Sequence, residues 1–219
     1  MHIITKKVTL LPARDPFARA TELTIELPDN LTEFGIRAAT LAEGATGITI
    51  DKGDGTAPFA VTEADFPLVL NYAAPGRYVI RLSDDIAALQ VNSNVTGEDF
   101  TKYRPLVTAV KSNADRLRTI SGSCFFGCTN LAAVDLHDCA ANLLGEMSFK
   151  GCTSLPDRID LPNIAAYDDV WDKKLPFRNC DSIREIHFSS AHEATIRAVP
   201  SFEKSPNLGA ENATVFFDP

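Results

Sequence analysis

The segment FKGCTSLPDRIDL, residues 149–161, has two close relatives in the same chain. They are FFGCTNLAAVDL at residues 125–136 and FRNCDSIREIHF at residues 177–188. All three share Phe, two residues, Cys, two residues, Leu or Ile, and then apolar residues at alternate positions. Two weaker copies begin at Phe100 and Phe202, so the phenylalanines are spaced by 25, 24, 28 and 25 residues. A period in this range is typical of solenoid proteins, in which each repeat packs against the next.

Each copy predicts one short strand of a continuous parallel sheet. In the first full copy, Val134 and Leu136 face the core and Asp135 faces the other way, because side chains alternate along a strand. The core-facing residues are expected to stack on Ile159 and Leu161 of the next copy, and the repeated Phe is expected to pack behind the sheet. One repeat cannot bury its own apolar face, so neighbouring repeats share their stability.

The five cysteines do not predict a disulfide framework. Three of them, Cys128, Cys152 and Cys180, hold the same repeat position and should lie about 4.8 Å apart in neighbouring strands. This spacing permits a disulfide, but a column of free thiols that act as small hydrophobic side chains is the favoured interpretation. Zinc is disfavoured because a zinc site requires paired Cys or His at short spacing.

The first half of the chain carries patterns of a different kind. Residues 23–27, 47–51 and 78–82 alternate apolar and polar side chains, as half-buried strands do. Turn residues separate these runs, which indicates a small antiparallel β-sandwich.

Two motifs in this half resemble a known family. ITIDKGDGT (48–56) followed by NYAAPGRYVIRLS (71–83) resembles the immunoglobulin-like PKD fold, whose hallmarks are a GDGT turn and a later Tyr-x-x-Pro-Gly-x-Tyr motif. The family usually has an aromatic residue where this chain has Lys52, so that core anchor is either missing or supplied from elsewhere, with Phe34, Phe59 or Phe66 as candidates. Asp51 and Asp54 lack a carboxylate at the twelfth position of an EF-hand loop. Asp54 is therefore expected to cap its own turn.

The repeats resemble the BspA-like type of bacterial surface leucine-rich repeat, whose unit reads approximately Phe-x-x-Cys-x-x-Leu-x-x-Ile-x-Leu-Pro. Leu161-Pro162 keeps the terminal pair, whereas Leu136-His137 and Phe188-Ser189 depart from it. The resemblance covers residues 100–217 and is specific in three copies. It implies a non-catalytic recognition surface on a secreted, cell-surface or phage-tail-associated protein.

The sequence thus predicts a mainly β protein with an immunoglobulin-like sandwich before a short leucine-rich-repeat solenoid. The predicted segments are an N-terminal arm or first strand (1–17), the PKD-like sandwich (18–98) and a solenoid of about five repeats (99–219). The predicted location is extracellular, on a cell surface or on a phage particle. The start of the chain shows no signal peptide, because it lacks an apolar region of about 7–15 residues.

Charge and motifs exclude other classes of function. The net charge of −8 argues against a nucleic-acid partner, which requires a basic patch. No segment approaches the ~20 consecutive apolar residues of a membrane span. The chain contains no Gly-x-Ser-x-Gly elbow, P-loop, His-Glu-x-x-His or Gly-x-Gly-x-x-Gly motif, so we predict neither an enzyme nor a cofactor.

The outward face of the predicted sheet is the first candidate binding surface. It carries Asp135, Arg158, Asp160, Glu185 and His187. Asp135, Asp160 and His187 would share one column, where stacked carboxylates repel each other. We hypothesise that protonated His187 pairs with Asp160, and the alternative is an ordinary solvated face. Asp and His can bind metals, but the sequence offers no clear third ligand, so no metal site is predicted.

The second candidate is the long segment 164–174, which holds Tyr167 and the only tryptophan, Trp171. Exposed aromatic rings beside acidic residues are suited to hold a sugar or a protein, although Trp171 is also well placed to be a core residue. The predicted function is non-catalytic binding of a protein or glycan. The alternatives are a phage or prophage tail-associated structural or receptor-binding protein and a structural spacer, and the oligomeric state stays open.

Overall fold

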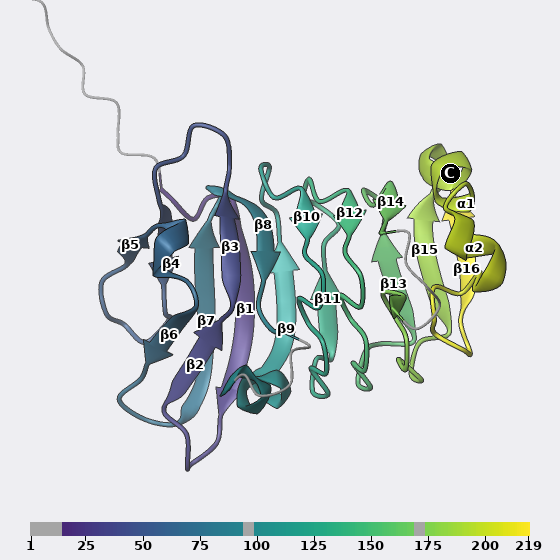
Figure 1. The fold of residues 1–219 in the computed structure, drawn as a ribbon. Helices are drawn as coiled ribbons and strands as arrows, with labels where there is room; N and C mark the ends of the chain where they lie inside the picture. The colour runs from purple at the N-terminus through teal and green to yellow at the C-terminus, as the bar shows by residue number, and fades with distance from the viewer. Residues whose placement is uncertain (1–14, 94–98, 169–173) are drawn as a thin grey trace, which may run out of the picture.

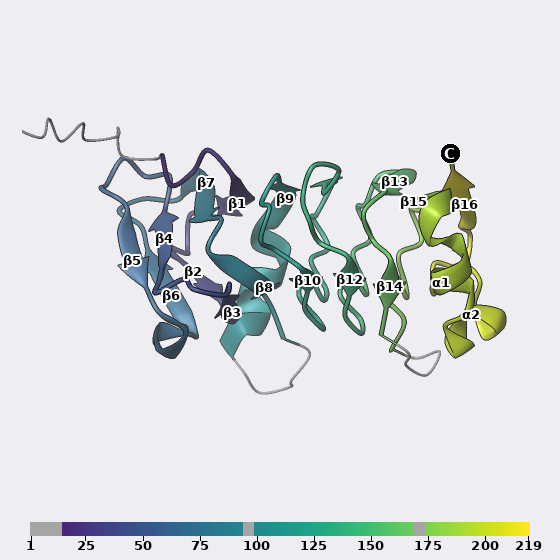
Figure 2. The same ribbon diagram turned by 90° about the horizontal axis from the view of Figure 1, so that it is seen from above.

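The computed structural model describes residues 15–93, 99–168 and 174–219, and the chain is mainly β. The strands are β1 (Ala20–Leu27), β2 (Glu33–Ile36), β3 (Ala38–Leu41), β4 (Ile48–Asp51), β5 (Phe59–Val61), β6 (Leu68–Asn71), β7 (Gly76–Ser83), β8 (Ile86–Gln90), β9 (Val107–Ser112), β10 (Thr119–Ile120), β11 (Ala133–Asp135), β12 (Leu143–Leu144), β13 (Arg158–Leu161), β14 (Ala166–Tyr167), β15 (Glu185–Ser189) and β16 (Thr214–Asp218). Short 3-10 helices span Glu63–Asp65, Asp99–Leu106 and Ser190–His192, and the α-helices are α1 (Glu193–Arg197) and α2 (Pro200–Lys204). Figures 1 and 2 show these elements in an elongated row that follows the chain from one end to the other.

The N-terminal half is built around β1. This strand pairs antiparallel with β7 along its whole length and with β9 on its other side. The sheet has six strands in the order β11-β9-β1-β7-β4-β5. Leu23 and Ile25 are fully buried, as the alternating pattern predicts for one face of a strand. The strands predicted at 23–27, 47–51 and 78–82 are thus confirmed in β1, β4 and β7.

The same sheet continues into the repeats. β9 follows the predicted boundary at residue 98, yet it lies between β1 and β11. β8 likewise pairs in parallel with β10. The buried apolar residues form one continuous core cluster that runs from Leu23 to Ala210. The boundary itself stays a prediction, and no break in these two sheets marks it.

The turn that carries the GDGT motif is closed by its own side chains. The Asp54 carboxylate accepts hydrogen bonds from the Thr56 backbone N–H at 3.1 Å and from its hydroxyl at 2.6 Å. This confirms that Asp54 caps the turn. The hydrogen bond from Lys52, followed by those from Thr56, lowers the pKa of Asp54 to about 2. Gly53 and Gly55 have φ angles of 75° and 81°, which non-glycine residues rarely adopt.

The repeats form two sets of parallel strands. One set consists of β10, β12 and β14, which continue from β8 with Ile120, Leu144 and Tyr167 in register. The other consists of β13, β15 and β16, where Ile159 pairs with Ile186 as the repeat pattern predicts. The sequence predicted the second set, whereas the first set was missed because its strands have only two residues each.

The predicted continuous sheet through all copies is wrong at one point. In the part of the chain that the structure describes, β11 pairs with β9 and β13 pairs with β15, but β11 and β13 are not paired. The backbone N–H of Ala132 donates to Thr108 in the first full copy, and that of Arg184 donates to Asp157 in the third. The second copy holds one more residue at this point, with three residues between Leu155 and Ile159 and only two between Leu131 and Val134 of the first copy. This insertion, which includes Pro156, breaks the regular spacing of the repeat.

The repeated Phe side chains stack in one column behind the strands. Phe125 and Phe149 have ring centroids 5.1 Å apart, and Phe149 and Phe177 have centroids 5.3 Å apart. All three are at most 1% exposed. The predicted burial of the Phe position is therefore confirmed in the three full copies.

The repeated cysteines form a second column and are free thiols. The Cys152 thiol donates to the Phe125 carbonyl at 3.0 Å, and the Cys180 thiol donates to the Phe149 carbonyl at 3.0 Å. Burial raises the pKa of Cys128 and of Cys180 to about 12. The interpretation as core thiols is confirmed, since these side chains satisfy a carbonyl and fill space without a disulfide.

Native protein is expected to resist alkylation at all five cysteines. Iodoacetamide attacks the thiolate, and each of the five thiols is at most 2% exposed, so mass spectrometry should detect five adducts only after denaturation. The raised pKa also means that unfolded thiols ionise first as the pH rises. Stability is therefore expected to fall above the unfolded value of about 8.5. Rapid stoichiometric labelling of the native chain would contradict the burial of this column.

Among residues 15–93, 99–168 and 174–219, no helix has the length and apolar character needed to cross a membrane.

Candidate functional site

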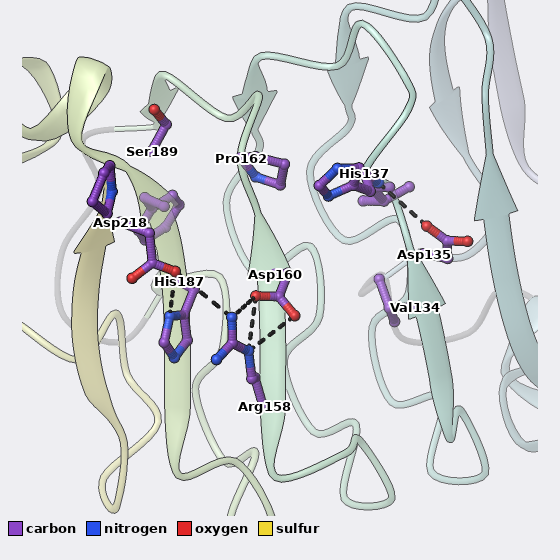
Figure 3. A pocket seen from close by; sticks show the side chains of 12 residues that line it. Val134, Asp135, His137, Arg158, Asp160, Pro162, His187, Ser189 and Asp218 are labelled. Atoms are coloured by element: carbon purple, nitrogen blue, oxygen red, sulfur yellow. Dashed lines mark hydrogen bonds and ion pairs between the residues drawn. The ribbon is translucent and has the colours of Figure 1, made fainter.

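A groove with a volume of about 530 Å³ lies on the outward face of β11, β13, β15 and β16 (Figure 3). Its charged and titratable lining residues are Asp135, His137, Arg158, Asp160, His187 and Asp218. The groove exists because alternation sends these side chains outward while their neighbours face the core. In β13, for example, Arg158 and Asp160 are exposed, whereas Ile159 and Leu161 are 1% exposed.

Four of the five residues predicted on this face line the groove. They are Asp135, Arg158, Asp160 and His187. The fifth, Glu185, contacts His187 through its carboxylate instead. The outward column predicted from the repeat therefore corresponds to a real depression in the surface.

Arg158 and Asp160 form a tight ion pair on β13. Arg158 Nε donates to both carboxylate oxygens at 2.9 and 3.1 Å, and Nη2 donates to Oδ1 at 2.6 Å. The guanidinium lowers the pKa of Asp160 by these hydrogen bonds. Nη2 also lies 3.6 Å from Asp218 Oδ2, so Arg158 links β13 electrostatically to the last strand.

His187 is the buried centre of the groove, with 8% of its surface exposed. Its ring stacks on Phe216, with centroids 4.7 Å apart and an interplanar angle of 16°. Its Nδ1 lies 2.8 Å from Asp218 Oδ2, and its Nε2 lies 3.0 Å from Glu185 Oε2. The expected direct pairing with Asp160 is thus replaced by contacts with Asp218 and Glu185, because the Asp160 carboxylate is turned toward Arg158.

Asp218 was not named among the predicted residues of this face, although the alternation of the fifth copy predicts it there. The weak fifth copy places Thr214 and Phe216 on the outward face, and the same alternation places Asp218 there as well. In the parallel register, Phe216 pairs with His187 and Asp218 pairs with Ser189. Asp218 thus lies two residue pairs beyond His187 in the ladder, and its carboxylate turns back toward the His187 ring, as Figure 3 shows.

No protein-family model matches this sequence, and no curated protein or solved structure matches it either. The interpretation of the groove therefore rests on its own chemistry. Four carboxylates, those of Asp135, Asp160, Glu185 and Asp218, lie in or next to the groove, together with two cationic side chains. These cations are Arg158 and Lys111, whose Nζ lies 3.4 Å from Asp135. With histidine neutral, four negative and two positive charges leave a net charge of −2, which disfavours anionic ligands.

The second predicted candidate is contradicted for Tyr167. Its side chain is 3% exposed, and its hydroxyl accepts a hydrogen bond from Ser201 at 3.3 Å. Tyr167 belongs to β14, where alternation places it in the core next to Leu144. Trp171 lies outside the described residues.

Proposed function

We propose that this protein is a non-catalytic recognition protein that binds a protein or a glycan in the groove on its parallel strands. The observation that supports this is the concentration of outward polar side chains from successive strands in one depression of about 530 Å³. We further propose that the fold is a PKD-like sandwich followed by BspA-like leucine-rich repeats. Such a protein would act outside the cell or on a phage particle.

The chemistry of the groove suits ligands that donate hydrogen bonds. Carboxylates accept hydrogen bonds from sugar hydroxyls and from Lys or Arg side chains. Phe216 is 38% exposed, and its ring stacks on His187, which lines the groove. Aromatic faces of this kind contact sugars and cations favourably. Neutral glycans and basic peptide segments are therefore the ligand classes that fit.

The test is binding of the purified chain to arrays of neutral glycans and of basic and acidic peptides, with EDTA present. A ligand is expected in the first two classes. Phe216→Ser is expected to weaken its binding about tenfold, which corresponds to about 1.4 kcal/mol. Val79→Ser is the matched control, because Val79 is 39% exposed on β7, away from the groove. The absence of any ligand, or equal binding by both variants, would favour the spacer alternative.

A further inference from the structure

We propose that Asp160, His187 and Asp218 bind one divalent transition-metal ion, such as Zn²⁺, in this groove. The site goes beyond the recognition function and does not depend on it. Asp160 and His187 were recognised in the sequence as residues with metal-ligand chemistry, but a third ligand was lacking. The fold supplies it by bringing Asp218 of β16 beside His187 of β15.

The three side chains come together without a large rearrangement. Each offers one ligand atom, and these atoms all lie within 4.8 Å of one another. Zinc bonds to nitrogen and oxygen are about 2.0–2.2 Å long, so two ligand atoms at a tetrahedral ion lie about 3.4 Å apart. His187 Nδ1 and Asp218 Oδ2 are already 2.8 Å apart. Asp160 is exposed, so a rotation of its side chain closes the remaining distance.

The surroundings of His187 favour a positive charge at its ring, because both ring nitrogens contact carboxylates. The buried ring is fixed by its stacking on Phe216, and Glu185 lies at hydrogen-bond distance from Nε2. A neutral imidazole has one donor and one acceptor nitrogen. If Nε2–H donates to Glu185, the Nδ1 lone pair points at the Asp218 carboxylate, and a positive species at Nδ1, either a proton or a metal ion, makes this contact favourable. A carboxylate on the far nitrogen is also the arrangement that orients metal-bound histidines.

The charges around the three ligands match a divalent ion. Asp160 and Asp218 neutralise its two positive charges, and Glu185 and Arg158 cancel each other. Arg158 does not compete for Asp160 outright. It uses three N–H···O contacts to this carboxylate, which has about four lone-pair sites. Arg158 can therefore keep part of its contact with Asp160 after that rotation and orient the carboxylate when the ion binds.

The test is calorimetric titration of the full chain with Zn²⁺, together with the absorption spectrum of the Co²⁺ complex. We expect one ion per chain. Asp218→Asn and His187→Asn are expected to abolish stoichiometric binding, and Glu185→Gln is expected to weaken it about 10- to 100-fold. His192→Asn is the matched control and should bind as the wild type does, because His192 lies in the 3-10 helix Ser190–His192, outside the cluster.

Two further measurements distinguish metal binding in the groove from metal binding by the cysteines, and a lost ligand from a lost fold. Thiolate ligation would give an intense charge-transfer band in the Co²⁺ spectrum, and such a band would overturn the proposal. Circular dichroism of the metal-free variants checks their fold. If His187→Asn fails to fold, Asp218→Asn decides, since this substitution replaces one half-buried carboxylate with an amide of the same shape. No stoichiometric binding by the wild type, or binding that survives Asp218→Asn, would also overturn it. Ligand binding on the arrays is measured with EDTA, so the recognition function can stand when the metal site fails.

Discussion

Replacing Phe149 with Ala is expected to lower the free energy of unfolding by about 3–5 kcal/mol. The side chain is 1% exposed and lies between the rings of Phe125 and Phe177, at 5.1 and 5.3 Å. Its removal deletes buried apolar surface, breaks two ring contacts and leaves a cavity that the backbone of neighbouring repeats keeps open. Since domains of this kind have a total stability of about 5–15 kcal/mol, this change removes a large part of it.

Urea unfolding followed by far-UV circular dichroism measures this change. The control is Val79→Ala, which shortens an exposed side chain and should change the stability by no more than about 0.5 kcal/mol. Equal unfolding midpoints for Phe149→Ala and Val79→Ala would show that the Phe column does not hold the repeats together.

Replacing Gly145 with Ala is expected to cost about 1–3 kcal/mol or more, because the added methyl group has no space. A Cβ atom there would lie 2.7 Å from the Gly122 Cα and from the Ser121 carbonyl carbon, and closer still to the Gly122 backbone nitrogen. These are backbone atoms of the preceding repeat and cannot rotate away. The two repeats would have to separate locally, which weakens the hydrogen bond of 2.8 Å from Gly145 N–H to the Ile120 carbonyl.

The matched control is Gly122→Ala, on the other side of the same contact. Its added Cβ would lie 3.3 Å from Glu146 Cγ and 3.4 Å from the Glu146 carbonyl oxygen, so a flexible side chain takes up most of the strain. Thermal and urea unfolding should therefore rank Gly145→Ala well below Gly122→Ala. A reversed order, or two variants as stable as the wild type, would contradict the close packing of these turns.

The repeat pattern predicted the interior of the second half well. Phe149, Cys152 and Ile159 are all buried, and Gly127, Gly151 and Asn179 take φ angles of 69°, 77° and 59°. These residues obey local rules: apolar side chains alternate along a strand, and only Gly or Asn tolerates a left-handed turn easily. The same alternation predicted the outward side chains of the candidate groove.

The features that the sequence did not predict depend on contacts between residues that are distant in sequence or on strands that are very short. β10, β12 and β14 are too short to show a period. The extra residue of the second copy breaks the spacing of a ladder that a pattern of apolar residues predicts to be continuous. The burial of His187 also went unpredicted. Its low exposure results from Phe216 and Asp218, which are distant in sequence and reach it only because β16 pairs with β15.

The sequence by itself determined the mainly β character, the column of Phe and Cys side chains, and the set of residues that point outward from the repeats. All of these follow from side-chain periodicity, which is a local property of the chain. Only the tertiary structure decided that the sheet of the first half continues through β9 into the repeats, and that Asp160, His187 and Asp218 meet in one groove. Both outcomes depend on which strands become neighbours, and strand pairing joins residues that no local pattern connects.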